Sequence, residues 1–225
     1  MPDSLPAYFD GLLRERPSLP FVTYYDERCG ERAEISAKSA ANWVAKIHFF
    51  LQDELGLGRG DRVRVSLPPD WLTVTVTLGA WSAGLEVVTA GPADIAVVSG
   101  PDGGTGADEV LRVDPSALSR SSAAPDDFVA AVRPMPDAWA SVRSLTVGSD
   151  LAFDGRSGTQ LIAAAASWPT GQRGLLLVPD DALAPMIDAL VAALLAGGSL
   201  VLVRTDAPEP ELGQRRAGQE RAVLL

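Results

Sequence analysis

One short stretch of the chain, Gly155-Arg156-Ser157-Gly158-Thr159, carries the small hydroxyl and glycine residues that suit a phosphate site. It stands where an alanine-rich helix is predicted to begin, over residues 158–167. Backbone N–H groups at a helix start are free to donate to an anion, and the helix dipole favours negative charge there. The candidate nucleotide-binding residues are therefore Gly155, Ser157, Gly158 and Thr159. A capped helix start accounts for both hydroxyl residues without any ligand, and it is the favoured interpretation.

Side chains for other kinds of catalysis are scarce. The single histidine, His48, lies between apolar residues in a predicted helix, so we interpret it as a structural residue near the edge of the core. With one histidine and one cysteine, neither a Ser-His-Asp arrangement nor a zinc site is predicted. The cysteine, Cys29, cannot form an internal disulfide and lies in a predicted turn. The sequence therefore predicts no catalytic residue and no metal ligand.

Other phosphate-binding and cation-binding patterns are incomplete. The G-x-x-x-x-G-K-[ST] loop is absent, and no lysine follows Lys46. The glycines of residues 100–106 follow a predicted strand but lack the G-x-G-x-x-G spacing, so a surface loop is the better interpretation. Three acidic residues lie in and after this loop, Asp102, Asp108 and Glu109. They could hold a divalent cation, although such clusters are usually only solvated.

Composition limits the range of partners. The chain has 225 residues, 47% of them hydrophobic, and a formal net charge of -10. No basic run is present, so neither nucleic acid nor an anionic membrane surface is a predicted partner. The most apolar stretch, residues 183–203, is interrupted by proline, aspartate and glycine, which favours a buried helix and strand over a membrane span. No signal peptide follows Met1, so we expect a cytoplasmic protein.

Hydrophobic periodicity predicts alternating strands and helices. A β-hairpin over residues 21–35 follows a short helix, and a β-α-β unit over residues 174–203 comes late in the chain. Between them lie predicted helices at 36–55 and 70–83 and predicted strands at 62–67, 85–89 and 94–99. This order is typical of an α/β fold with a mostly parallel sheet, helices on both faces and a small N-terminal β-hairpin. We expect a single domain over residues 1–225, with an irregular acidic segment rich in Gly, Pro and Ser at about 100–150.

Local signals predict where several elements begin and end. Asp3 or Ser4 is expected to cap the first helix, over residues 3–16, and Asp180-Asp181 to cap a helix that ends at Gly197-Gly198. The irregular segment is expected to hold a strand near 110–113 and short helices near 115–121 and 126–133. The tail from residue 207 is polar, and residues 221–225 could add a final strand.

Three segments of the first 90 residues form one recognisable pattern. They are Leu57-Gly58-Arg59-Gly60-Asp61-Arg62-Val63, Leu67-Pro68 and Leu78-Gly79-Ala80-Trp81-Ser82-Ala83-Gly84. Together they resemble the opening of the AMP-binding adenylate-forming family, which includes acyl-CoA synthetases, luciferases and peptide-synthetase adenylation domains. Residues 175–203 extend the likeness more weakly, and the chain is most similar to a short actinobacterial family of truncated AMP-binding proteins. The resemblance implies the N-terminal-subdomain fold of that family, with the glycines serving as scaffold.

The functional parts of that family are where the chain departs from it. The family's phosphate loop ends in Lys-Gly, and its nearest counterpart here, Gly155 to Thr159, is shorter and has no lysine. The family's aromatic-Gly-x-Thr-Glu motif, ribose-binding Asp, hinge and C-terminal catalytic Lys have no match in this sequence. Adenylation needs cations and magnesium around the α-phosphate. The resemblance therefore implies a catalytically inactive relative that uses no cofactor.

We accordingly hypothesise a binding or regulatory module for a protein partner or a small adenylate-like ligand. The alternative is a protein that still binds a nucleotide or acyl-adenylate, with ATP or AMP and magnesium, or a ligase-type enzyme completed by another chain. The enzyme hypothesis requires a pocket at the carboxyl ends of the strands, lined by Ser157, Thr159 and a cation such as Arg156 or Arg173. The module hypothesis predicts an exposed apolar patch, for which Trp139 is the favoured tryptophan, whereas Trp81 is expected in the core.

Overall fold

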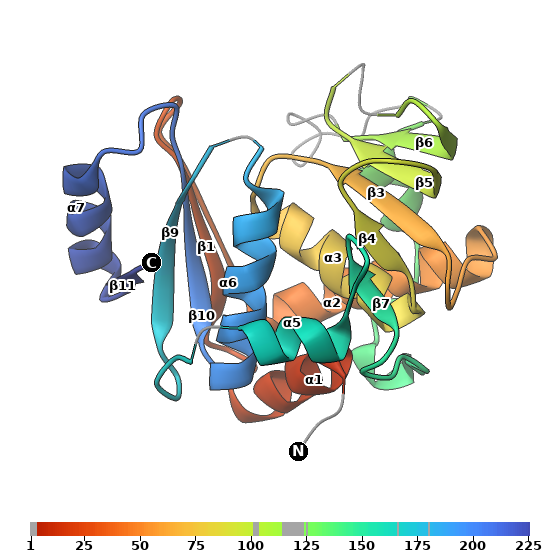
Figure 1. Cartoon of the computed structure of the whole chain (residues 1–225), viewed down its shortest axis with the longest axis horizontal. Coiled ribbons are helices and arrows are strands. Elements are labelled where there is room, and N and C mark those ends of the chain that lie inside the picture. Colours follow the sequence, from red (N-terminus) through yellow and green to blue (C-terminus); the bar gives the residue numbers. More distant parts are fainter. Residues whose placement is uncertain (1–3, 101–103, 114–123, 125, 166, 180) are drawn as a thin grey trace. The chain divides into compact units, whose positions relative to one another are not determined.

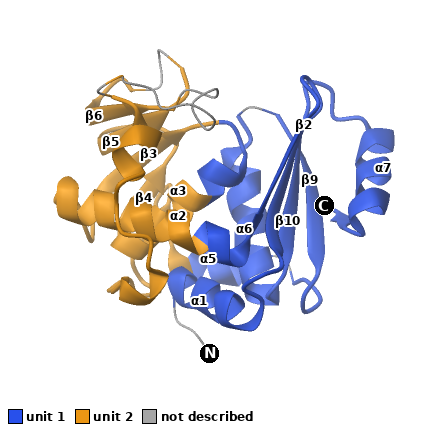
Figure 2. Cartoon of the chain, turned by 180° about the vertical axis from the view of Figure 1, so that it is seen from behind, with its two compact units in different colours: residues 1–40, 68–74, 159–225 blue, residues 41–67, 75–158 orange. Residues whose placement is uncertain are grey.

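The computed structural model of the chain describes residues 4–100, 104–113, 124, 126–165, 167–179 and 181–225 (Figure 1). The chain divides into two compact units, each assembled from separate stretches of sequence (Figure 2). Unit 1 comprises residues 1–40, 68–74 and 159–225, and unit 2 comprises residues 41–67 and 75–158. The expectation of a single domain over residues 1–225 stays a prediction.

Unit 1 is built on a five-stranded sheet, here called sheet A, with the strand order β11-β9-β10-β1-β2. Its strands are β1 (Pro20–Asp26), β2 (Glu31–Ser36), β9 (Arg173–Val178), β10 (Ser199–Arg204) and β11 (Val223–Leu224). The predicted hairpin is confirmed, because β1 and β2 pair antiparallel, whereas β10 pairs parallel with both β1 and β9. Every residue of β10 from Leu200 to Val203 is 0% exposed, as expected for a central strand that is covered on both faces.

Helices lie on both faces of sheet A, as predicted. Helix α6 (Leu183–Ala196) connects β9 to β10 and completes the predicted β-α-β unit. Helices α1 (Leu5–Glu15) and α6 lie on one side of sheet A, and α7 (Pro210–Glu220) lies on the other (Figures 1 and 2). Helix α6 ends at Gly197, whose φ of 58° is left-handed, a conformation that glycine adopts without a Cβ clash.

Unit 2 is built on a six-stranded sheet, here called sheet B, with the strand order β6-β5-β3-β4-β7-β8. Its strands are β3 (Arg62–Ser66), β4 (Glu86–Val88), β5 (Ala93–Val98), β6 (Ala107–Arg112), β7 (Leu151–Phe153) and β8 (Arg156–Ser157). Strands β7 and β8 pair antiparallel, and the other neighbours in this order pair parallel. The α/β class and the mostly parallel pairing are confirmed, but the strands are divided between two sheets instead of forming one.

Two long helices, α2 (Ala37–Phe49) and α3 (Trp71–Ala83), contribute residues to both units. Within unit 2 they approach closely at Gly79, where an added Cβ would lie 2.5 Å from Cγ2 and 2.7 Å from Cβ of Ile47. Trp81 is 1% exposed and donates from its Nε1 to the Ala152 carbonyl oxygen at 2.8 Å, so it belongs to the core as predicted. The shorter helical elements are a π-helix (Phe50–Glu54), α4 (Phe128–Val132), a 3-10 turn (Trp139–Ser141) and α5 (Gly158–Ala164).

Two elements escaped the sequence patterns, the β7–β8 hairpin and α7. Helix α7 was not predicted because its sequence has almost no apolar periodicity, and only Leu212 and Gly213 of this helix are buried. Ser4 directly precedes α1, as predicted for a capping residue, but its side chain makes no hydrogen bond to the helix. The predicted cap of α6 was wrong, because α6 begins after Ala182 and not after Asp181. The predictions for Asp3, Asp102, Asp180 and residues 115–121 lie outside the described residues.

Large apolar side chains are exposed at several places, among them Leu145 at 79% in unit 2 and Val223 at 51% in unit 1. Trp139, the tryptophan favoured for exposure, is only partly exposed. Across the part of the chain that the structure describes, no helix is both long and apolar enough to cross a membrane.

The contact at Gly79 yields a stability prediction. We expect Gly79→Ala to destabilise the protein by about 1–3 kcal/mol, because the new methyl group must displace Ile47. The matched control is Gly11→Ala in α1, where an added Cβ meets nothing within 4 Å and where alanine favours the helix by up to about 1 kcal/mol. Urea unfolding measures both changes. Equal stability of the Gly79→Ala and wild-type proteins would contradict the close helix packing.

Candidate functional site

The predicted nucleotide-binding residues lie in and after the β7–β8 hairpin. Gly155 is at its turn, Ser157 ends β8, and Gly158 begins α5, all within unit 2. Thr159 is the next residue of α5 and is exposed, and it belongs to unit 1. The predicted helix start is therefore present, but α5 has only seven residues, and a strand precedes it instead of an open loop.

Backbone N–H groups near this turn already have acceptors within unit 2. The Gly155 N–H donates to Oε1 of Glu86 at 2.6 Å, and the Gly158 N–H donates to the Asp150 carbonyl oxygen at 3.0 Å. Glu86 is only 6% exposed, and its other carboxylate oxygen lies 3.3 Å from Nε of Arg62. An anion at Gly155 would have to displace a buried carboxylate, which electrostatics opposes.

A second carboxylate fixes the turn itself. Asp154 has a left-handed φ of 43°, and its carboxylate accepts from the backbone N–H and the hydroxyl of Thr89 at 2.9 and 2.8 Å. Asp154-Gly155 is a pair that favours tight hairpin turns, and this was the sequence signal that could have revealed the β7–β8 hairpin. The guanidinium of Arg156 lies over the Phe153 ring, 5.2 Å from its centroid, so this cation packs against β7.

The single histidine is structural, as predicted. His48 is 1% exposed, and its Nδ1 lies 3.2 Å from Oγ of Ser82, which donates to the Gly79 carbonyl oxygen at 2.8 Å. Burial lowers the pKa of His48, although the charge of Asp53 and a hydrogen bond at Ser82 oppose this effect. A neutral imidazole sealed between α2 and α3 within unit 2 has no access to a substrate.

Sequence reasoning missed a polar cluster at the carboxyl edge of sheet A, where ligands bind in many α/β proteins. Asp26 ends β1, and Arg204 ends β10 beside it. Nη2 of Arg28 donates to Asp26 at 2.7 Å, Nη1 of Arg204 lies 3.5 Å from it, and the Tyr24 hydroxyl donates to it at 3.3 Å. Hydrogen bonds from Arg28 lower the pKa of Asp26 to about 2 despite its burial. The charges at this edge therefore compensate one another.

Asp70 adds an ionisable group to the same unit. Its Oδ1 accepts from the Thr73 backbone N–H at 2.8 Å, so it caps α3 as the sequence predicted. Burial raises the pKa of Asp70 to about 6, against the opposing effect of hydrogen bonds from Thr73 and Leu72 and of the Arg204 charge. Burial also raises the pKa of Tyr24.

Over the described ranges, no group of three or more His, Cys, Asp or Glu side chains is placed to hold a metal ion.

No protein-family model matches the chain. A TIGR03089 family protein from Mycobacterium tuberculosis is 34% identical to it over 247 aligned residues, which cover 97% of this chain and 96% of that protein. The similarity therefore extends along both chains almost from end to end.

Solved structures of adenylate-forming enzymes share the fold. The chain matches Brucella canis acyl-CoA synthetase with a TM-score of 0.74 and 18% identity, over 98% of this chain and 46% of that one. It matches the Klebsiella oxytoca NpsA N-terminal subdomain in complex with 3-hydroxyanthranilyl-AMSN (TM-score 0.70, 15% identity, 100% and 60% covered). It also matches the N-terminal domain of FACL13 from Mycobacterium tuberculosis (TM-score 0.67, 13% identity, 97% and 61% covered). The chain thus spans about half to three fifths of the length of these structures, and its fold is that of their N-terminal subdomain.

The raised pKa of Asp70 predicts a pH-dependent effect of Asp70→Asn. Burial disfavours the charged carboxylate, so the folded protein is most stable when Asp70 is protonated, below about pH 4. The free energy of unfolding then falls as the pH rises through about 6 and Asp70 loses its proton. Asparagine keeps the capping oxygen and carries no charge. We expect the variant to match wild type at pH 4 and to be about 1–2 kcal/mol more stable at pH 8, as measured by urea unfolding at both pH values. A variant that is less stable than wild type at pH 8 would show that the charge at the helix start outweighs burial.

Proposed function

The chain belongs to the TIGR03089 protein family, and we propose that it is a catalytically inactive member of the adenylate-forming fold that serves as a binding or regulatory module for a protein partner. The observation that carries the proposal is the engagement of the Gly155 amide by the buried Glu86 carboxylate. That amide stands at the place where the sequence has its nearest counterpart to a phosphate loop.

Charge around this turn supports the absence of nucleotide chemistry. Glu86 and Asp154 both direct carboxylate oxygens at backbone N–H groups, those of Gly155 and Thr89. A phosphate oxygen about 4 Å from one such carboxylate is repelled by about 4 kcal/mol at the effective dielectric constant of a protein surface. One recovered backbone hydrogen bond contributes only about 1 kcal/mol. Arg62, 3.3 Å from the Glu86 carboxylate, offsets part of this repulsion, but an anion at the turn must still displace that carboxylate from the Gly155 N–H.

Two other cations of unit 2 have structural roles. No lysine follows Lys46 in the sequence, and the Nζ of Lys46 donates to the Arg133 and Met135 carbonyl oxygens at 2.8 and 2.6 Å. Arg59 donates from its Nε to the Asp150 carboxylate at 2.9 Å. Within unit 2 these side chains thus hold loops together, which favours a scaffold over a nucleotide site.

The fold alone also fits a ligase-type enzyme that another chain completes, because the chain spans only part of the enzymes that it matches. The activities that the names of those enzymes state belong to those enzymes and are not assigned to this chain. A test of nucleotide binding separates this second candidate from the proposed function.

We expect thermal unfolding of the purified protein to be unchanged by ATP, AMP and magnesium at millimolar concentration, or by 3-hydroxyanthranilyl-AMSN, the compound in the NpsA structure. A ligand at about 100 times its dissociation constant would add about 2.7 kcal/mol of stability and raise the midpoint visibly. The physical reason for the expected result is the carboxylate at Gly155.

Two variants make this result decisive. Glu86→Gln keeps an acceptor for the Gly155 N–H and removes the charge that opposes a phosphate and pairs with Arg62, so it tests whether that charge excludes the nucleotide. The double variant Ser157→Ala, Thr159→Ala removes both candidate hydroxyls. A raised midpoint in wild type that disappears in the double variant would refute the proposal and support a nucleotide or acyl-adenylate site.

A further inference from the structure

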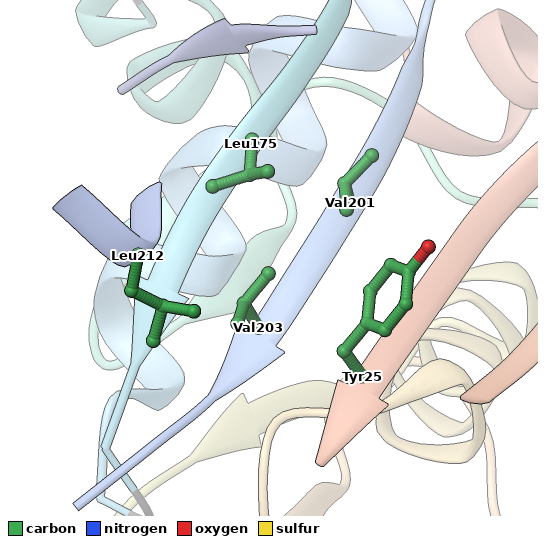
Figure 3. Packing of buried hydrophobic residues seen from close by; sticks show 5 residues of the cluster. All are labelled: Tyr25, Leu175, Val201, Val203 and Leu212. Carbon is green, nitrogen blue, oxygen red and sulfur yellow. The ribbon is translucent and has the colours of Figure 1, made fainter. Parts of the chain in front are cut away.

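The side of sheet A under α7 is a continuous apolar surface with a basic margin. Tyr25, Leu175, Val201 and Val203, at most 8% exposed, form a cluster with Leu212 of α7 (Figure 3). Beside it, Arg32 is the cross-strand neighbour of Tyr25, and Arg173 is the first residue of β9. Apolar side chains flanked by arginines are the composition of a surface that binds a partner helix.

Helix α7 covers this surface with few apolar contacts of its own. Of its eleven residues, Leu212 and Gly213 are buried, and Ala217 is partly buried against the cluster. A helix of this length is marginal in isolation, and burial of one leucine offsets little of the entropy lost on ordering it. Other interactions must therefore hold α7 in place.

Those interactions are polar and converge on Glu220, at the end of α7. Its carboxylate accepts hydrogen bonds from the Tyr25 hydroxyl, from Nη2 of Arg173 at 2.8 Å and from Nη2 of Arg32 at 3.4 Å. Burial raises the pKa of Glu220, but the Tyr25 hydrogen bond and the two arginine charges outweigh it, so the pKa is lowered and the group is charged at neutral pH. One turn earlier, the Arg216 guanidinium lies over the Tyr25 ring, 4.1 Å from its centroid, and pairs with Glu27 at 2.6 Å.

The junction after the helix is strained. Arg221 has a left-handed φ of 51°, a conformation that costs a non-glycine residue about 1 kcal/mol or more, and β11 then adds only two residues to the sheet edge. The segment from α7 to β11 therefore has one buried leucine, polar contacts at Glu220 and a strained backbone at Arg221. Such a segment is expected to have a low free energy of local unfolding.

We propose that the segment from Pro210 to Leu224, here called the strap, leaves sheet A reversibly, and that the surface it uncovers binds an acidic amphipathic helix of a protein partner. This deepens the proposed function by naming the binding surface, and it rests on that function. The partner helix carries an apolar residue and, eight positions later, a carboxylate, as Leu212 and Glu220 do, because residues at that spacing lie on one helix face. The carboxylate is required because, among the described residues, Arg173 and Arg32 would otherwise keep only Glu34 as a neighbouring acid.

Native-state hydrogen exchange of the whole chain tests the opening step. We expect amides of α7 to exchange faster than those of β10 under native conditions. Glu220→Gln, which keeps size and removes charge, should speed exchange in α7 roughly tenfold or more and leave β10 unchanged. Arg221→Gly relieves the strain and should slow exchange in α7. Equal rates in α7 and β10, or equal acceleration of both by Glu220→Gln, would overturn the proposal.

A peptide with the sequence of residues 206–225, carrying a fluorophore, serves as the probe for the uncovered surface. We expect it to bind the Glu220→Gln chain more tightly than the Arg221→Gly chain, because the strap competes less in the former. The same peptide with Glu220→Lys should bind neither, since its ammonium group meets Arg173 and Arg32. Equal binding of both peptides, or none to the Glu220→Gln chain, would refute the assigned surface. Such a peptide-binding result would not affect the test of nucleotide binding. Conversely, a midpoint of thermal unfolding that is raised by nucleotide would refute the proposed function without altering hydrogen exchange in α7.

Discussion

A buried carboxylate, Glu86, fixes the arrangement of unit 2 around the β7–β8 turn. A carboxylate that is 6% exposed must be paired and hydrogen-bonded, because an unpaired buried charge is strongly destabilising. Arg62 supplies the charge at 3.3 Å, and the Gly155 N–H supplies a hydrogen bond at 2.6 Å. The turn is thereby held against β3 and β4, the strands that carry Arg62 and Glu86. The turn that resembles an anion-binding loop in sequence thus has its Gly155 N–H already engaged by a carboxylate.

Elements with strong apolar periodicity could be predicted from the sequence, and the others could not. β10 is buried along its centre, α6 along most of its length and β9 in part, and all three are rich in apolar residues, so their order, their type and the glycine that ends α6 follow from local composition. α7 depends on contacts made at long range. Its single buried leucine packs on β9 and β10, and its last residue bonds to side chains of β1, β2 and β9. The β7–β8 hairpin had one local signal, Asp154-Gly155, but its strands are too short for periodicity to show.

The candidate sites also differ in how far the sequence alone could predict them. The glycine and hydroxyl residues at 155–159 are contiguous, so sequence alone could single them out, yet only the structure shows that a carboxylate some seventy residues earlier accepts from that turn. Tyr24, Asp70 and Arg204 lie far apart in the sequence, and parallel pairing of β1 with β10 brings the strand ends together. The two carboxyl groups differ in what dominates: hydrogen bonds from Arg28 lower the pKa of Asp26, whereas burial raises that of Asp70.

The segments that resemble the adenylate-forming family have packing roles that survive without its chemistry. Gly84 has a φ of 90°, and a Cβ added to it would lie 3.0 Å from the Cα of Arg59. Gly79 lacks a side chain at the place where Ile47 packs against α3. These constraints maintain the fold whether or not a nucleotide binds, so similarity in such positions reports architecture and not activity. Under the proposed function, specificity for a partner comes from an element that moves. In unit 1, the strap is held to sheet A mainly by polar contacts, and its departure leaves an apolar surface and two arginines in need of a partner.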